Sequence, residues 1–184
     1  RLARYAAFAA DFPLDRWWEL TGVSQVLTWR RELFVPSTLL AEFPQSNDTT
    51  YLHRLDQPAA RAWFATSART ADDGTALELL ADPGFDLQST VILPPESGAV
   101  DGHLPAATGS IEIEELAPER LQFHVTASGD ALLYISQAWM PGWRLEGAEG
   151  DHAPILKLPA FALKRANLAF MAVAVPAGEH HFDL

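Results

Sequence analysis

Cysteine is absent from this sequence, which excludes a disulfide framework, a thiolate nucleophile and thiolate metal ligands. No apolar run approaches the ~20 residues that a membrane-spanning helix needs, and no signal peptide is recognisable. Basic residues are few, since 13 lysines and arginines stand against 24 aspartates and glutamates, for a net charge of −11. Such an excess of negative charge repels nucleic acid and anionic lipid, so we expect no nucleic-acid partner.

The 184 residues suffice for one large domain or two small ones. A chain of this length buries roughly 70% of the surface of its extended form on folding, so its core needs no disulfide or other covalent cross-link. The chain starts at Arg1 and ends at Leu184, inside a segment that is typical of a strand. We therefore expect it to be part of a longer polypeptide.

The most apolar stretch, residues 131–145, is the segment around which we expect the rest of the chain to be organised. Seven of the nine residues at 131–139 are apolar, which predicts a strand buried on both faces. Pro141 and Gly142 then interrupt the pattern, because proline cannot donate to a strand ladder and glycine relaxes the backbone. We expect a corner at which the chain passes from one sheet to another and restarts at Trp143.

The first third of the chain mixes helical and strand patterns. Residues 2–10 and 14–21 have helical periodicity, and residues 23–29 alternate as in a strand. Residues 30–49 are polar and rich in turn formers, which indicates a connector, and residues 50–55 are typical of a short strand.

A β-α-β unit is predicted next. Strand patterns at 61–69 and 89–93 flank a helical segment at 75–81, and Thr75 has capping-box spacing to the glutamate three residues later. A right-handed crossover makes the two strands parallel, and the strand at 23–29 could lie in the same small sheet.

Residues 94–110 are rich in proline, glycine and alanine and are the best candidate for a boundary. Beyond them the pattern changes to short strands separated by turns, at 111–116, 121–126, 131–139, 143–146, 154–158, 162–164, 169–175 and 180–184. The sequence thus predicts an α+β fold, with a small α/β portion at 1–95, a linker at 96–110 and an antiparallel β-sandwich, immunoglobulin-like or jelly-roll-like, at 111–184. The first portion has too few strands to bury its own apolar side chains, which favours one core shared by both portions.

After the apolar strand, four segments follow one another in this order: Pro141–Trp143, Glu149–Gly150, 166–170 and 173–180, with three more upstream at 18–27, 58–64 and 76–86. Their order resembles the C-terminal soluble part of the YfhO family. In that family a strand is followed by Pro-Gly-Trp, an Asp-Gly turn, an Asn-x-x-Phe segment and a Val-Pro-x-Gly-x-His hairpin. This chain departs from the pattern at Glu149, where aspartate is usual.

The resemblance implies a location in the cell, and it implies that catalysis belongs to another part of the polypeptide. YfhO-family proteins are large bacterial multi-pass membrane proteins that look like C-type glycosyltransferases using lipid-linked sugar donors, with their chemistry in the membrane portion. This chain is then a non-catalytic accessory domain on the extracytoplasmic face of the bacterial cell membrane, without a cofactor. Its expected partners are the membrane-embedded remainder of the same polypeptide and a glycan or cell-envelope polymer acceptor.

The residues themselves leave other functions open but name no enzyme. Six histidines raise the question of a metal site, yet His180 and His181 are adjacent and point to opposite faces of a strand, and the other four are scattered. We therefore predict no metal site. The 24 carboxylates include no pair that sequence can identify as glycosidase-like, and no serine lies in a nucleophile-elbow motif. An enzyme would need a cleft with converging carboxylates.

A carbohydrate-binding β-sandwich module is the alternative function. Tryptophan and tyrosine rings stack on pyranose rings, and neighbouring polar groups bind the hydroxyls. A module of this kind needs at least two exposed aromatic rings side by side, whereas the competing interpretation is that the tryptophans close the core. The candidate ligand-binding residues are Tyr134, Gln137, Trp139, Trp143 and Arg144, and the candidate backbone positions of the motif are Pro141, Gly142 and Gly178.

Overall fold

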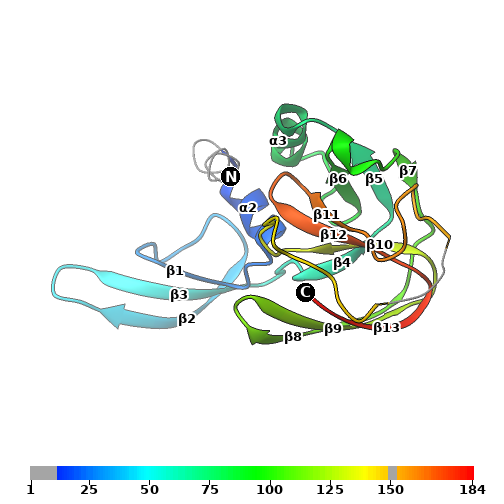
Figure 1. The fold of residues 1–184 in the computed structure, drawn as a ribbon. Helices are drawn as coiled ribbons and strands as arrows, with labels where there is room; N and C mark the ends of the chain where they lie inside the picture. The colour runs from blue at the N-terminus through cyan, green and yellow to red at the C-terminus, as the bar shows by residue number, and fades with distance from the viewer. Residues whose placement is uncertain (1–11, 149–152) are drawn as a thin grey trace.

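The structure is a computed structural model that describes residues 12–148 and 153–184, with 44% of residues in strands and 12% in helices (Figure 1). The helix predicted at 2–10 and the predicted turn at Glu149–Gly150 lie outside the described residues. The helices are α2 (Leu14–Thr21) and α3 (Asp73–Ala81), with a 3-10 turn η1 (Pro95–Ser97). The strands are β1 (Gln25–Thr28), β2 (Ser37–Pro44), β3 (Thr49–Leu55), β4 (Ala62–Ala65), β5 (Ser67–Thr70), β6 (Thr90–Leu93), β7 (Gly102–His103), β8 (Gly109–Ala117), β9 (Arg120–Ala127), β10 (Ala131–Ile135), β11 (Leu163–Ala166), β12 (Phe170–Val175) and β13 (Gly178–Asp183).

A four-stranded antiparallel sheet, in the order β11-β12-β10-β4, lies at the centre of the described chain. All five residues of β10 are buried, so the predicted burial on both faces is confirmed. Its side chains alternate between two clusters, because neighbouring residues of a strand face opposite sides. Leu133 and Ile135 pack with Phe123 and Phe182 of the three-stranded antiparallel sheet β13-β9-β8, whereas Leu132 and Tyr134 face the other cluster.

The second cluster joins the two predicted portions. Leu20 of α2 and Leu80 of α3 lie in it together with Leu132 and Ala172 of the central sheet, so the expected shared core is present. Strand β4 also pairs directly with β10. The boundaries predicted at 95 and 111 stay a prediction.

The β-α-β unit is confirmed, with two corrections. Strands β5 and β6 are parallel and α3 connects them, while β7 adds an antiparallel edge. The strand predicted at 61–69 is two strands in different sheets, because Thr66 and Ser67 both donate their backbone amides to the carbonyl of Ser89 and the chain bends there. Asp72, not Thr75, caps α3, since its carboxylate accepts the Thr75 amide at 2.8 Å.

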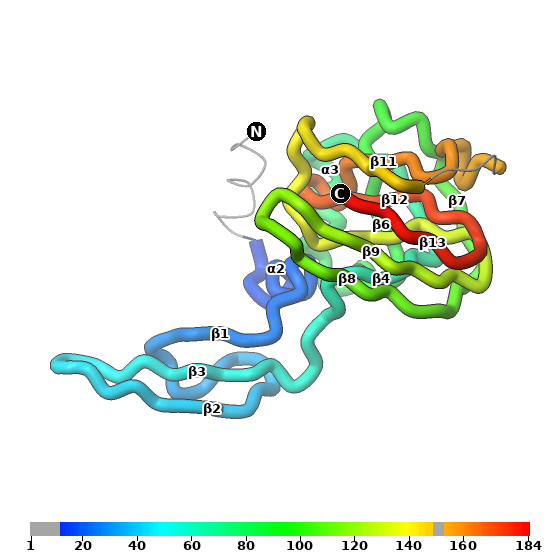
Figure 2. The backbone as a smooth tube through the Cα atoms, turned by 60° about the horizontal axis from the view of Figure 1, so that its bottom comes forward, coloured from blue at the N-terminus to red at the C-terminus, as the bar shows by residue number. Residues whose placement is uncertain are grey.

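A separate antiparallel sheet, β1-β3-β2, projects from the body as an arm (Figure 2). Strand β1 pairs with β3, so it does not lie in the sheet of β5 and β6 as the sequence suggested. Strand β2 occupies part of the predicted connector, and it was missed because it has no buried face to impose an apolar alternation. Exposed large apolar side chains gather on the arm and its loop: Leu27, Trp29, Phe34, Leu39, Leu40 and Phe43.

The chain after β10 differs from the prediction. Strand β10 ends at Ile135, and Pro141 and Gly142 form a turn inside a loop rather than a corner between two sheets. The predicted strands at 143–146 and 154–158 are reduced to isolated bridges, Glu146 with Asp183 and Ile155 with Leu158. The passage between sheets occurs instead between β12 and β13.

Candidate functional site

An open groove of about 570 Å³ lies where the loop after β10 meets the β8–β9 turn and the end of β13. Its walls therefore come from three segments that are far apart in the sequence. Four of the lining residues, Met140, Gly142, Trp143 and Arg144, belong to the stretch at 131–145 that the sequence singled out. The lining residues are Ala117, Pro118, Glu119, Arg120, Met140, Gly142, Trp143, Arg144, Glu146, Asp183 and Leu184.

Trp143 is the one aromatic residue among the described residues that line the groove. Its ring nitrogen donates to the carbonyl of Ala138 at 3.1 Å, and its backbone amide donates to the carbonyl of Met140 at 3.1 Å. The side chain is half-buried and packs against the core cluster while it also lines the groove. Beside it, Met140 is 54% exposed. The indole is thus held in one orientation with part of its surface available to a ligand.

Arg120 and Asp183 form the polar wall. The Arg120 guanidinium donates to one oxygen of the Asp183 carboxylate through Nη2 at 2.6 Å and Nε at 3.1 Å, and Gln122 donates to the other oxygen at 3.2 Å. The hydrogen bond from Arg120, followed by that from Gln122, holds the pKa of Asp183 below its usual range, and the same contact with Asp183 raises the pKa of Arg120. Asp183 is therefore an ionised acceptor and not a proton donor near neutral pH.

Backbone pairing holds this wall in place. Glu146 and Asp183 exchange backbone hydrogen bonds of 3.0 and 2.9 Å, which ties the loop to β13. Leu121 and Leu184 exchange another pair, both at 2.8 Å. The groove therefore rests on strand ends with paired backbones, and such rigid elements position side chains more exactly than loops alone.

The other predicted ligand residues are distributed outside the groove. Tyr134 is 1% exposed, stacks on Trp63 with ring centroids 5.0 Å apart and donates its hydroxyl to the carbonyl of Leu20 at 2.8 Å. It is a core residue, so its prediction as a ligand-stacking residue is wrong. Trp139 is half-buried and packs against the core cluster without lining the groove, and Gln137 accepts a hydrogen bond from Arg61 at 3.3 Å.

The three predicted backbone positions have different roles. Pro141 and Gly142 are exposed in the turn. A methyl group added at Gly142 would meet no atom within 4 Å, so that glycine is not required for space. Gly178 opens β13 with a φ of 124°, a conformation that side chains of L-amino acids rarely adopt, so the passage from β12 to β13 depends on it.

Sequence reasoning missed Glu119, Arg120, Glu146 and Asp183. Asp183 and Arg120 lie 63 positions apart and meet only because β13 pairs with β9, in a register that places Asp183 opposite Gln122. The alternation of β9 signals that a partner strand exists, but no local pattern identifies which strand it is.

Among the described residues, no helix is both long and apolar enough to cross a bilayer. Comparisons of the chain with family models, with curated proteins and with solved structures find no match. The resemblance to the YfhO family therefore rests on the quoted motifs alone.

Proposed function

We propose that this chain is a non-catalytic accessory domain of a multi-pass membrane glycosyltransferase-like protein and holds a glycan or polymer acceptor on the extracytoplasmic side. The observation that carries the proposal is the groove in which the half-buried indole of Trp143 lies beside Arg120, Arg144 and Asp183. A ligand site of this kind combines an apolar surface with a few fixed polar groups.

The chemistry of the groove suits a sugar. One face of a pyranose ring is apolar and stacks on an indole, while its hydroxyls need acceptors and donors at the edge of the ring. The ionised carboxylate of Asp183 accepts from hydroxyls, and the exposed guanidinium of Arg144 donates to them. The Arg120–Asp183 contact already exists without ligand, so binding need not order that pair.

The polar wall favours binding over hydrolysis. A glycosidase needs a carboxylic acid whose pKa is raised so that it can protonate the leaving oxygen. The pKa of Asp183 is shifted in the opposite direction by Arg120 and Gln122. This carboxylate is therefore suited to hold a hydroxyl and unsuited to act as a general acid.

The arm supports attachment to a larger host. Leu27 and Trp29 are 65% and 71% exposed, and exposed apolar patches usually mark a contact surface. Between residues 25 and 55, three arginines balance three acidic residues, although the whole chain carries a charge of −11. An arm with no net charge and with exposed apolar side chains is suited to contact the membrane-embedded remainder of the polypeptide, without the repulsion that the negative charge of the rest of the surface would cause.

The alternative is a carbohydrate-binding module in which the two antiparallel sheets around Phe123 and Leu133 form an immunoglobulin-like or jelly-roll-like sandwich. Such a module needs two aromatic rings side by side. Among the described lining residues of the groove, Trp143 is the one aromatic residue. That favours the accessory domain, which needs only to hold an acceptor weakly while the host supplies further contacts.

The test is a titration of the purified chain with peptidoglycan fragments, teichoic-type polymers and neutral oligosaccharides. Tryptophan fluorescence is the signal recorded during each titration. We expect a saturable shift with at least one of these glycans, retained in Trp139→Ala and lost in Trp143→Ala. Arg144→Ala is the second variant, since this exposed side chain can be removed without touching the core, and it should weaken binding about tenfold, as loss of one hydrogen bond to a charged group does.

Two results would overturn the proposal. One is the absence of a saturable shift with every glycan class for protein that is folded by circular dichroism. The other is binding that is unchanged in both Trp143→Ala and Arg144→Ala, because the ligand would then lie outside the groove.

A further inference from the structure

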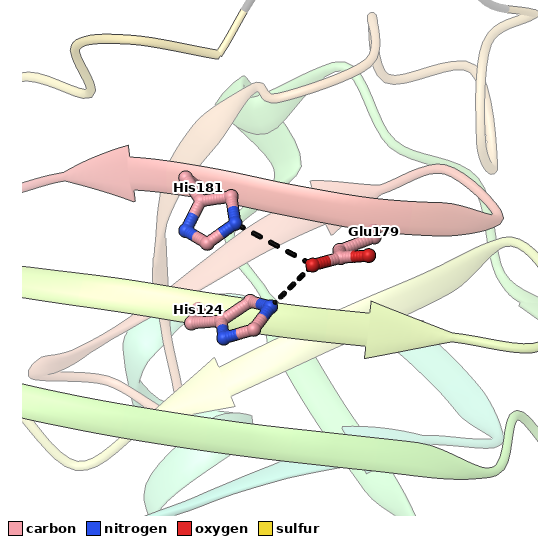
Figure 3. A group of neighbouring side chains, drawn as sticks. All are labelled: His124, Glu179 and His181. Atoms are coloured by element: carbon pink, nitrogen blue, oxygen red, sulfur yellow. Dashed lines mark hydrogen bonds and ion pairs between the residues drawn. The ribbon is translucent and has the colours of Figure 1, made fainter.

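Two histidines that are far apart in the sequence meet on the exposed face of the β13-β9-β8 sheet (Figure 3). The antiparallel register of β13 and β9 places His181 directly opposite His124. Glu179 lies two residues before His181 and so projects from the same face of β13. Adjacent His180 points to the other face, where its ring contacts the carbonyl of Pro176 and the ring of Phe161. One histidine of the adjacent pair is thus free to join His124.

The side chains of His124, His181 and Glu179 converge on a small volume. One oxygen of Glu179 lies 2.9 Å from Nε2 of His124 and 3.6 Å from Nε2 of His181, and the three ligand atoms lie within 4.8 Å of one another (Figure 3). In a tetrahedral zinc site with bonds of about 2.0–2.1 Å, ligand atoms are about 3.3 Å apart. The distances of 2.9 and 3.6 Å bracket that value, so small side-chain rotations bring the three atoms around one ion.

The two histidines reach the same carboxylate from neighbouring strands. The imidazoles of His124 and His181 stack with centroids 4.1 Å apart and planes 19° from parallel, and Nε2 of each ring lies toward Glu179. Because the electron pair of Nε2 lies in the plane of its ring, the two rings must tilt toward each other when both bind one ion. Because the strands are paired along their length, the backbone holds the two Cβ atoms at a fixed separation. Little backbone reorganisation is then required when an ion binds.

Glu112 lies on the outer side of the His124 ring. It stands opposite His124 on β8, and its carboxylate is 3.8 Å from Nδ1, too far for a hydrogen bond. Nε2 of His124 is 2.9 Å from Glu179 in the metal-free protein, and an ion bound there takes the place of a proton on Nε2. A carboxylate on the Nδ1 side is where a metal-bound histidine usually finds its outer hydrogen-bond partner.

We propose that His124, His181 and Glu179 form a binding site for Zn²⁺, with water completing the coordination. Two imidazole nitrogens and one carboxylate oxygen suit zinc, whereas Mg²⁺ and Ca²⁺ prefer oxygen ligands alone. The side chains of His181 and Glu179 are 67% and 63% exposed, so the ion is reached from solvent and keeps open positions. This site does not depend on the proposed glycan groove and can be tested without any sugar.

The test is calorimetric titration of Zn²⁺ into tag-free protein. We expect one saturable site, with affinity lowered at least tenfold in His124→Ala and in His181→Ala, and about tenfold in Glu179→Gln, as ligand and near-ligand changes commonly do. His103→Ala is the matched control, since it removes an exposed histidine from another sheet and should leave the affinity unchanged. Titrations with Mg²⁺ and Ca²⁺ should give no saturable heat.

A second measurement locates the ion in the unmodified protein. Zinc should shift the ring ¹⁵N signals of His124 and His181 and leave those of His53 and His103 in place. The proposal is overturned if folded protein binds no zinc saturably, if His124→Ala and His181→Ala both retain full affinity, or if the shifted signals belong to other histidines.

Discussion

Arg120 and Asp183 are 63 positions apart in the sequence, yet two nitrogens of the Arg120 guanidinium donate to one oxygen of the Asp183 carboxylate. This contact joins the start of β9 to the end of β13 and forms the polar wall of the groove. The same strand pairing places His181, two residues before Asp183 on β13, opposite His124, four residues after Arg120 on β9. One register thus positions both the groove wall and the proposed zinc site.

The Arg120–Asp183 contact predicts a pH-dependent loss of stability. Because Arg120 and Gln122 lower the pKa of Asp183 in the folded protein, its stabilising contribution is present above the unfolded pKa of about 3.9 and is lost as pH falls through the folded value. Asp183→Asn should therefore lower the free energy of unfolding at pH 7, and the difference from the unmodified protein should disappear in acid. Urea unfolding at the two pH values measures this, and an equal difference at both would contradict it.

Tyr134→Phe should affect stability and leave ligand binding intact. The substitution removes the hydroxyl that donates to the carbonyl of Leu20 inside the core, which costs about 1–2 kcal/mol of unfolding free energy. Stacking on Trp63 survives because the ring remains. Urea unfolding and the glycan titration are the two measurements. Normal stability combined with lost glycan binding would return Tyr134 to the ligand site and contradict its assignment to the core.

Asn167 in the Asn-x-x-Phe segment is predicted to be a structural residue. It is fully buried with a φ of 42°, and its side-chain oxygen accepts the backbone amide of Ile92 at 2.7 Å. Asn167→Ala leaves that amide without a partner in the core, at a cost of about 1–3 kcal/mol. Asn47→Ala, in an exposed loop, is the matched control and should stay within about 0.5 kcal/mol. Equal unfolding free energies for the two variants would refute this role.

The arm should tolerate polar substitutions. Leu27→Ser and Trp29→Ser remove side chains that are mostly exposed, so each should change the unfolding free energy by no more than about 0.5 kcal/mol. Both should reduce binding of an apolar dye such as ANS, which reports exposed hydrophobic surface. Leu116→Ser, an exposed position on β8, is the control for a single apolar side chain away from the arm. A large loss of stability would mean that the arm has a core of its own.

Local sequence patterns predicted those helices and strands in which buried side chains recur at a regular spacing. Strand β9 buries Leu121, Phe123 and Val125 on one face, and that alternation is visible in the sequence. Strand β2 has no buried face, and its residues therefore gave no signal. The bend at Thr66 was invisible for another reason, since it depends on hydrogen bonds to Ser89, 23 residues later.

The groove was predictable only in part. Trp143 and Arg144 were predicted as ligand residues because an aromatic ring with a neighbouring polar group can hold a pyranose ring, and both line the groove. The prediction that Tyr134 binds a ligand was wrong. Strand β10 is apolar on both faces, so its sequence has no alternation from which to tell which face each side chain lies on. Arg120 and Asp183 are ordinary surface residues by pattern, and only their pairing makes them part of the groove.

The sequence by itself determined that residues 131–135 form a buried strand, because an uninterrupted apolar run leaves the backbone no better way to bury those side chains. Only the tertiary structure decided that His181 faces His124. Strand register depends on which distant strands pair and on how they are aligned, and a shift of one residue would turn either histidine to the opposite face.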